Sequence, residues 1–157
     1  MKPNIGISDK KLSAVTELLS VVLANQVTLY TKTRKFHWNV SGDSFMELHK
    51  LFESQYKLIE ESIDLVAERI SKLGSATIGT MSEFSKLTSI KEHPNKYESS
   101  KDMIKELLGD HESIVKELRK DVDHCSDKFN DAVTADFLTG LMEEHETIAW
   151  TLRRYLK

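Results

Sequence analysis

The sequence predicts an all-α protein, a four-helix bundle in which a long crossover carrying a short extra helix joins the second and third long helices. Apolar residues recur at spacings of three, four and seven along four long stretches, which is typical of helices that bury one face. The connections after the first and third stretches are short, whereas the middle connection is long. A composition of 39% hydrophobic and 30% charged residues, with two prolines and six glycines, is typical of a soluble helical protein.

The chain has the size of one domain, and we expect residues 1–157 to form it, with residues 1–8 as a short N-terminal tail. No run approaches the roughly 18 consecutive apolar residues of a membrane-spanning helix, and the first residues lack the apolar segment of a secretory signal. We therefore expect a cytoplasmic protein without membrane contact. The single cysteine, Cys125, cannot form an internal disulfide, and we interpret it as a small buried residue without a redox role.

The first long helix should cover residues 8–38, with Ser8 or Asp9 as its N-cap. Residues 39–43 are of turn-forming types, so a tight loop should end this helix. The apolar residues of the helix lie at spacings that place them on one face; they are Leu12, Val15, Leu19, Val22, Leu23, Leu29 and Phe36.

The second long helix should start near Asp43 or Ser44 and end before Gly74. Glu47 lies three residues after Ser44, a spacing that resembles a capping box. Apolar residues again follow the helical period over this stretch. Each of the first two helices should therefore be roughly thirty residues long.

The helical period of the apolar residues is lost over residues 74–98. Within this stretch, residues 82–90 are expected to form a short helix. The third long helix shows the cleanest period, ending near Cys125, and the fourth begins near Val133. Because the segment 126–131 between them is short, these two helices should be antiparallel neighbours. Two short connections and one long crossover describe the ferritin-like arrangement of a four-helix bundle.

Four side chains of metal-ligand type lie in or beside the second helix: His37, His49, Asp64 and Glu68. Imidazole and carboxylate donors without thiolates suit a first-row divalent metal such as iron, manganese or zinc. On a continuous helix, His49 and Asp64 would be about 22 Å apart at 1.5 Å per residue. Asp64 and Glu68 share one face, and His37 can approach His49 across the loop. One chain therefore supplies two separated halves of a site.

A twofold axis resolves this separation. If two copies pack their second helices antiparallel, crossing near residues 56–57, the histidines of one chain meet the carboxylates of the other, and each dimer contains two equivalent sites. The usual alternative is a site inside one bundle, made from glutamates and Glu-x-x-His pairs. No histidine of this chain has a glutamate three residues before it. We therefore predict an oligomer whose metal sites lie between subunits.

The residues that carry these sites are similar to the ferroxidase signature of the Dps family, the mini-ferritins that protect DNA in starved bacteria. The resemblance covers residues 36–70 in type and spacing, and the helix lengths, the crossover and Trp150 agree with it over nearly the whole chain. The matching residues are His37-Trp38, Gly42, Phe45, Leu48-His49 and Asp64-x-x-Ala67-Glu68-Arg69-Ile70.

This resemblance implies a hollow homododecamer in the bacterial cytoplasm, at or near the nucleoid, that oxidises Fe(II) and stores ferric oxide. The family usually prefers hydrogen peroxide as the oxidant. His37, His49, Asp64 and Glu68 match the family's iron ligands, and zinc or another divalent metal is an alternative occupant of the same site. Trp38 resembles an aromatic residue that intercepts oxidising equivalents, although packing at an interface explains it equally well.

Three acidic residues near the junction of the third and fourth helices are candidates for an iron entry pore, because carboxylates line threefold pores there in the family. They are Asp127, Asp131 and Asp136. A ring of negative charge would concentrate a cation at such a pore. Helix capping is the alternative for Asp131, which precedes the fourth helix.

Three further side chains of ligand type have ordinary explanations. Glu53 lies one turn after His49 and is a candidate for a second iron or for mineral nucleation, with a solvated surface carboxylate as the alternative. His111 and His145 lie on the apolar faces of the third and fourth helices, so we expect them to be core histidines.

Direct DNA binding is a weaker expectation. The net charge is −3, and the N-terminal tail with the start of the first helix offers only Lys2, Lys10 and Lys11 for phosphate contacts. Protection by removal of iron and peroxide is therefore favoured over coating of DNA. The alternatives that remain are a nucleoid-binding structural protein with secondary metal oxidation, and a protein that holds zinc or another ion without redox turnover.

Overall fold

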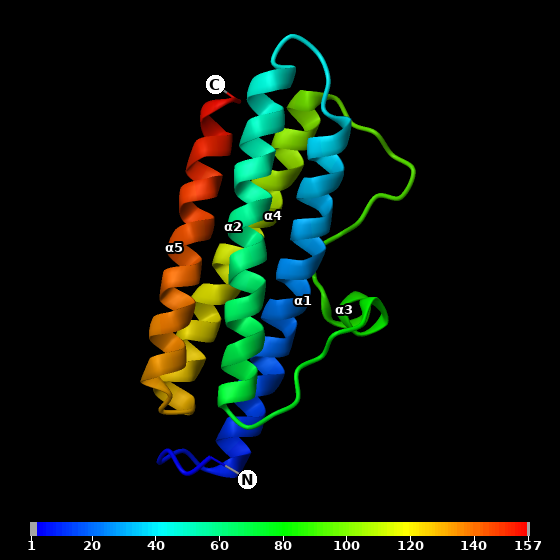
Figure 1. The fold of residues 1–157 in the computed structure, drawn as a ribbon. Coiled ribbons are helices and arrows are strands. Elements are labelled where there is room, and N and C mark those ends of the chain that lie inside the picture. Colours follow the sequence, from blue (N-terminus) through cyan, green and yellow to red (C-terminus); the bar gives the residue numbers. More distant parts are fainter. Residues whose placement is uncertain (1–2, 157) are drawn as a thin grey trace.

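The computed structural model describes residues 3–156, and within them it contains five α-helices, one π-helical turn and no β-strand. The four long helices form one bundle (Figure 1), as the sequence predicts. In chain order the elements are α1 (Asp9–Asn39), α2 (Phe45–Lys72), α3 (Met81–Leu87), α4 (Ser100–Asp123), the π-helical turn η1 (His124–Lys128) and α5 (Ala132–Arg154).

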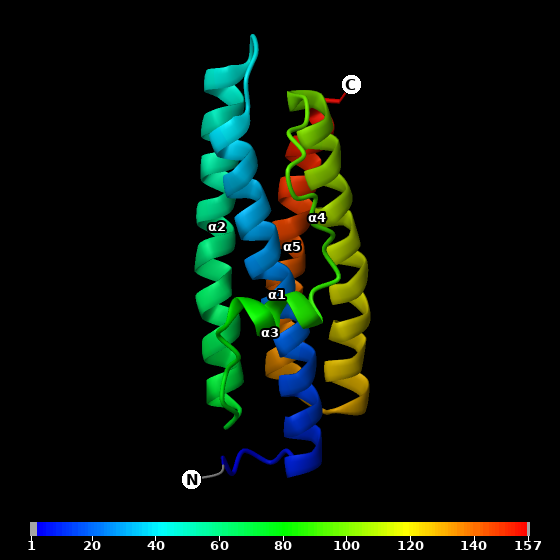
Figure 2. The same ribbon diagram turned by 90° about the vertical axis from the view of Figure 1, so that its right-hand side faces the viewer.

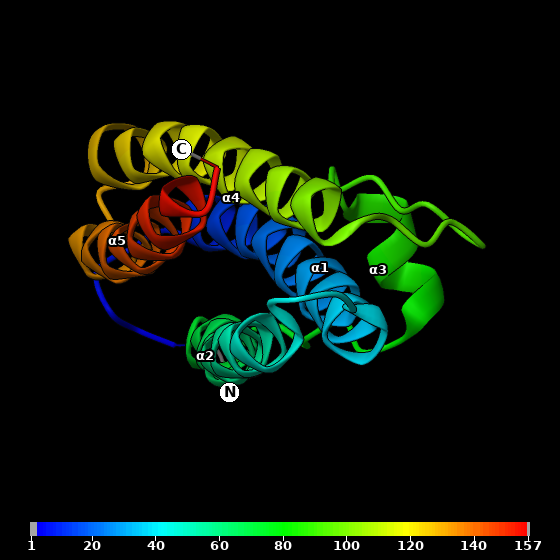
Figure 3. The same cartoon turned by 90° about the horizontal axis from the view of Figure 1, so that it is seen from above.

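The helices form two antiparallel hairpins that pack side by side. In Figure 1, α1 runs up the bundle and α2 returns beside it, whereas α4 runs down and α5 returns. The crossover between α2 and α4 climbs past α1 from one end of the bundle to the other, and α3 lies on it outside the bundle (Figures 2 and 3). Because of this crossover, α2 and α4 run in the same direction, which confirms the ferritin-like arrangement.

The loop between α1 and α2 is short and has a defined geometry. The N–H of Val40 donates to the carbonyl of Phe36 and closes α1. Gly42 then adopts φ +103°, a conformation that glycine reaches without steric cost. The predicted capping box at Ser44 is wrong, because its side chain makes no cap hydrogen bond. Its backbone, at φ −96° and ψ 21°, lacks the extended conformation of a side-chain N-cap.

The crossover is attached to the bundle through a buried amide. Asn25 of α1 accepts hydrogen bonds from the backbone and hydroxyl of Ser89, and its own amide donates to Glu117 of α4. The short helix α3 ends at Leu87, three residues before its predicted end. The capping box that the sequence suggested for α2 occurs at this helix instead, between Thr80 and Glu83.

The core contains the apolar faces of all four long helices. Among the described residues, α1 is the one helix with the length and apolar composition to cross a membrane, but 61% of that stretch is buried inside the bundle. It is therefore a core helix. Cys125 is fully buried, and burial, followed by the charges of Asp131 and Asp121, raises the pKa of its thiol to about 12. The thiolate is thus disfavoured, which supports the interpretation of Cys125 as a packing residue.

Candidate metal centre

The imidazoles of His37 and His49 lie against each other beside the α1–α2 loop. Their ring centroids are 3.7 Å apart, and their planes differ by 20°. The ring of Tyr56 packs edge-on against His37, and Phe45 packs against His49. His37 is buried at 8% exposure, whereas His49 is half-buried. The structure therefore brings these two predicted ligands together, as the short loop suggested.

Two reciprocal hydrogen bonds set the orientation of both rings. His37 Nδ1 lies 2.7 Å from the carbonyl oxygen of His49, and His49 Nδ1 lies 2.9 Å from the carbonyl oxygen of His37. A carbonyl oxygen only accepts, so each Nδ1 carries the hydrogen. In the neutral rings each Nε2 then holds a lone pair, which is the form in which imidazole binds a metal. Among the described residues, no hydrogen bond occupies either Nε2.

Asp64 and Glu68 lie one turn apart near the other end of α2, and both are exposed. Lys72 donates to Glu68 over 2.9 Å in an ion pair whose side chains are more than half exposed. Because α2 is continuous from Phe45 to Lys72, Asp64 remains about 22 Å and Glu68 about 28 Å along the helix from His49. The structure thus brings the histidines together and the carboxylates together, but it does not unite the two pairs within one chain.

Glu53 lies one turn after His49 on α2. Its carboxylate accepts a hydrogen bond from Lys57 over 2.6 Å. This bond and the charge of Lys57 lower the pKa of Glu53, and the nearby imidazoles of His37 and His49 contribute in the same direction. Glu53 is therefore an ionised group within electrostatic reach of both imidazoles.

A cationic aromatic cluster adjoins the histidine pair, and the sequence analysis missed it. The guanidinium carbon of Arg34 lies 5.3 Å from the ring centroid of Trp38, 4.8 Å from that of Tyr56 and 5.5 Å from that of Tyr30. Trp38 itself is 64% exposed. Residues 30, 34 and 38 are spaced by four and share one face of α1, so their spacing was a usable signal.

The three candidate pore residues have different surroundings. Asp127 and Asp136 are exposed, whereas Asp131 is 2% exposed. Asp131 accepts hydrogen bonds from the backbone and hydroxyl of Thr134 and forms an ion pair with Arg69 over 3.1 Å. The carboxylate of Asp131 is therefore held at the N-terminus of α5, which favours the capping interpretation for this residue.

His111 and His145 are fully buried, in agreement with the expectation of core histidines. Their Nδ1 atoms lie 2.8 Å apart, and His145 Nε2 lies 2.7 Å from the amide nitrogen of Gln26. Ser62 donates weakly to the oxygen of Gln26 over 3.4 Å. All four long helices thus contribute to one buried polar chain. It contains no carboxylate, so it offers no charge to offset a buried cation.

Known proteins are similar to this chain in sequence and fold. The model of the ferritin-like domain family matches residues 16–157. An uncharacterized low temperature-induced protein of Nostoc sp. is 46% identical over 98% of this chain and 86% of its own length. DNA protection during starvation protein 2 of Bacillus anthracis is 35% identical over 90% of this chain and 96% of its own length. A crystal structure of a Dps protein from Vibrio cholerae O1, described as a member of a broad superfamily of ferritin-like diiron-carboxylate proteins, superposes with a TM-score of 0.92. It is 28% identical and covers 99% of this chain and 97% of its own.

Proposed function

The chain belongs to the Dps family of ferritin-like proteins, and from this premise we propose that it oxidises Fe(II), stores the ferric product and thereby protects DNA. One observation carries the proposal. The chain holds a pair of oriented imidazoles and a pair of exposed carboxylates on one rigid helix, too far apart to share an ion. The description of the Vibrio cholerae relative as a ferritin-like diiron-carboxylate protein supports iron as the metal.

Two copies complete the site if their α2 helices pack antiparallel around a twofold axis near residues 56–57. His49 of one copy then lies opposite Asp64 of the other, and the reverse contact forms by symmetry. Five exposed apolar side chains of α1 and α2 support burial of this region against another subunit; they are Trp38, Phe45, Met46, Leu58 and Leu65. We propose that six such dimers form the hollow dodecamer that the family resemblance implies.

The side chains have distinct roles in this site. The Nε2 atoms of His37 and His49 donate lone pairs, while Asp64 and Glu68 supply negative charge that offsets the charge of Fe(II). Lys72 leaves Glu68 at little cost, because exposed ion pairs contribute about 0–1 kcal/mol. Glu53 is the candidate for a further iron ligand once Lys57 is displaced.

Hydrogen peroxide is the proposed oxidant. Two Fe(II) ions each give up one electron, and one peroxide takes both electrons and two protons and leaves as two water molecules. Because both electrons reach the same peroxide, its O–O bond breaks without release of hydroxyl radical. In this proposal Trp38, which directly follows His37 in the sequence, intercepts any oxidising equivalent that escapes, and the ferric product accumulates in the cavity of the dodecamer.

DNA protection in this proposal comes from the removal of iron and peroxide in the bacterial cytoplasm. Lys10 is exposed and Lys11 is half-buried at the start of α1, whereas Lys2 lies outside the described residues. Binding of DNA by this tail predicts a retarded complex that weakens steeply with salt and is lost on deletion of residues 1–11. Protection that survives this deletion supports the iron-based route.

Removal of both carboxylates tests the ferroxidase. Fe(II) and peroxide are mixed anaerobically, and ferric absorbance is followed for the wild type and for Asp64→Ala/Glu68→Ala. We expect the initial rate to fall roughly 100-fold or more, since even residues that only support a metal ligand change affinity or activity by 10–100-fold. The matched control is Glu112→Ala/Glu146→Ala, which removes two exposed ion-paired carboxylates on α4 and α5. Equal rates in the wild type and the Asp64/Glu68 variant would refute the assignment.

Mixing of two inactive variants tests whether the site is shared. Chains with His37→Ala/His49→Ala are unfolded and refolded together with chains that carry Asp64→Ala/Glu68→Ala. In a random mixture, about a quarter of intersubunit sites combine intact histidines with intact carboxylates, so about a quarter of the activity should return. A site within one chain would return none, and light scattering that finds only monomers would also exclude a shared site.

A further inference from the structure

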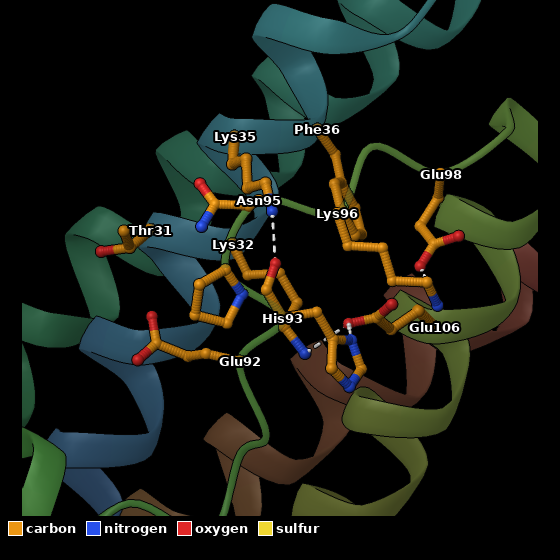
Figure 4. A pocket seen from close by; sticks show the side chains of 11 residues that line it. Thr31, Lys32, Lys35, Phe36, Glu92, His93, Asn95, Lys96, Glu98 and Glu106 are labelled. Atoms are coloured by element: carbon orange, nitrogen blue, oxygen red, sulfur yellow. Dashed lines mark hydrogen bonds and ion pairs between the residues drawn. The ribbon is translucent and has the colours of Figure 1, made fainter.

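A second group of metal-ligand side chains lies far from α2 in the part of the chain that the structure describes. His93 and Glu98 come from the crossover, and Glu106 comes from α4 (Figure 4). One ligand atom from each residue lies within 4.8 Å of the other two. His93 Nδ1 and a carboxylate oxygen of Glu106 are already 3.0 Å apart. Donor atoms around Zn²⁺ in a tetrahedral site are roughly 3.3 Å apart, so small side-chain rotations suffice to surround an ion.

These three side chains line a pocket of about 350 Å³ between α1, α4 and the crossover. The carboxylates lie in its wall, because the side chains of Glu98 and Glu106 are only 13% and 18% exposed. His93 is 43% exposed and lies at the surface of the pocket. In Figure 4 the imidazole of His93 and the carboxylate of Glu106 point toward each other. The pocket therefore has shielded carboxylates with an imidazole accessible to an arriving ion.

Glu106 shares its nearest ammonium group, that of Lys32, with a second carboxylate. Burial raises the pKa of Glu106, but the hydrogen bond and charge of Lys32, together with His93, outweigh burial and hold the pKa below its usual value. Lys32, only 5% exposed, is shared between Glu106 at 2.9 Å and Asp110 at 2.7 Å. One buried ammonium group thus lies against two carboxylates and cannot neutralise both if both are ionised. Another cation can therefore be attracted to this group.

Lys96 supplies that cation in the structure. It forms an ion pair with Glu98, and its pKa is raised first by this hydrogen bond and then by the charges of Glu98, Glu106 and Asp102. Its ammonium therefore lies in the field of several carboxylates. The side chain of Lys96 is 62% exposed, so it can move into solvent at little cost. A divalent ion in its place would compensate the remaining carboxylate charge as well.

We propose that His93, Glu98 and Glu106 form a second divalent-metal site, in which a borderline ion such as Zn²⁺ replaces the ammonium of Lys96. One imidazole with two carboxylates favours such an ion over Ca²⁺ and Mg²⁺, which prefer oxygen donors alone, and over Cu(I), which prefers thiolate and thioether. The bound ion joins the crossover to α4 and so fixes the connection that gives the bundle its topology. The proposal is independent of iron oxidation at the α2 site.

Calorimetric titration with Zn²⁺ tests the site in the full-length Asp64→Ala/Glu68→Ala protein, in which the α2 site lacks its carboxylates. We expect Zn²⁺ to bind, and His93→Ala or Glu106→Gln to weaken this binding roughly tenfold or more. Lys96→Gln should tighten binding about threefold, because it removes the competing cation. An ordinary network of ion pairs would not show this gain.

The matched control is His124→Ala, which removes a half-buried histidine from η1, away from the pocket. It should leave the affinity for Zn²⁺ unchanged, and circular dichroism should show that all variants retain their helices. The visible absorption of Co²⁺ gives a second readout, since loss of the imidazole ligand changes its spectrum. Absence of binding in the starting protein, or equal affinity after His93→Ala, would overturn the proposal whatever the ferroxidase activity.

Discussion

The two histidine pairs of this molecule use the same side chains but are connected in opposite ways. His37 and His49 each donate to the other's backbone carbonyl, so both Nε2 atoms stay free. His111 and His145 are hydrogen-bonded to each other, and Gln26 occupies a further nitrogen of His145. The first pair can give two lone pairs to a metal, whereas three of the four ring nitrogens of the second pair are hydrogen-bonded within the core, and His111 Nε2 is buried without a partner. The partner of Nδ1 thus decides whether both Nε2 atoms of a histidine pair can present lone pairs.

Among the substitutions that distinguish the two histidine pairs, replacement of both His37 and His49 by alanine should have the largest effect. The rate of Fe(II) oxidation should fall roughly 100-fold or more, because the site loses both nitrogen ligands. The urea midpoint should fall less than after substitution of a fully buried core histidine, because His49 is half-buried, although His37 is 8% exposed and both rings lose their bonds to backbone carbonyls. Stopped-flow ferric absorbance and urea unfolding measure the two quantities. A large loss of stability with unchanged oxidation would reverse the roles assigned to the two pairs.

Leucine in place of His145 should have the opposite effect. The substitution roughly preserves volume but leaves His111 and Gln26 without their partner, at a cost of about 2–3 kcal/mol in the free energy of unfolding. His111→Leu should cost less, because His111 Nε2 is buried without a hydrogen-bond partner in the structure and the substitution removes it. Urea unfolding at fixed protein concentration gives both values. Equal costs for the two substitutions would contradict the expectation that His145, which has two hydrogen-bond partners, contributes more to stability than His111, which has one.

Acid should destabilise the fold through the buried pair, His111 and His145. Burial lowers the pKa of His145 to about 4, and burial together with the charge of His145 lowers the pKa of His111 well below its usual value. In the unfolded chain both groups titrate near 6.5, so below that pH the unfolded chain binds more protons. The stabilisation is therefore complete above pH 6.5 and is lost as the pH falls toward 4.

Between pH 7 and pH 5, we expect His145 to reduce the free energy of unfolding by up to about 2 kcal/mol. Carboxylates also titrate over part of this range, so the quantity to measure is the difference in pH dependence between wild type and His145→Leu. Urea midpoints at both pH values supply it. A pH slope that is the same in the two proteins would contradict a neutral buried His145.

The helices were predictable because their apolar residues repeat with the helical period, and burial of one face decides where a helix forms. The separation of His49 from Asp64 was equally predictable from the sequence, since it follows from the fixed rise of a continuous helix. The capping box at Ser44 failed for a different reason. The tight turn at Gly42 sets the backbone of Ser44 outside the extended region, and residue types alone do not report that angle.

Other features could not be predicted, because they depend on backbone atoms or on irregular segments, neither of which has a recognisable sequence pattern. The bonds that orient His37 and His49 end on backbone carbonyls, which every residue possesses, so no residue type marks them. His93 and Glu98 lie on an irregular crossover, and their approach to Glu106 depends on how that segment folds back onto α4. The burial of Asp131 likewise became visible only when Arg69 of α2 was placed beside it.

The reciprocal bonds of His37 and His49 also bear on the order of folding and assembly. Both partners belong to one hairpin, so the imidazole half is complete once α1 and α2 have folded together, before any second chain arrives. In the proposed assembly, the partner then contributes the carboxylates and with them the charge that attracts Fe(II). Under this proposal, a newly made chain is inert toward iron until it is paired. Oxidation then begins only in the oligomer that stores its product.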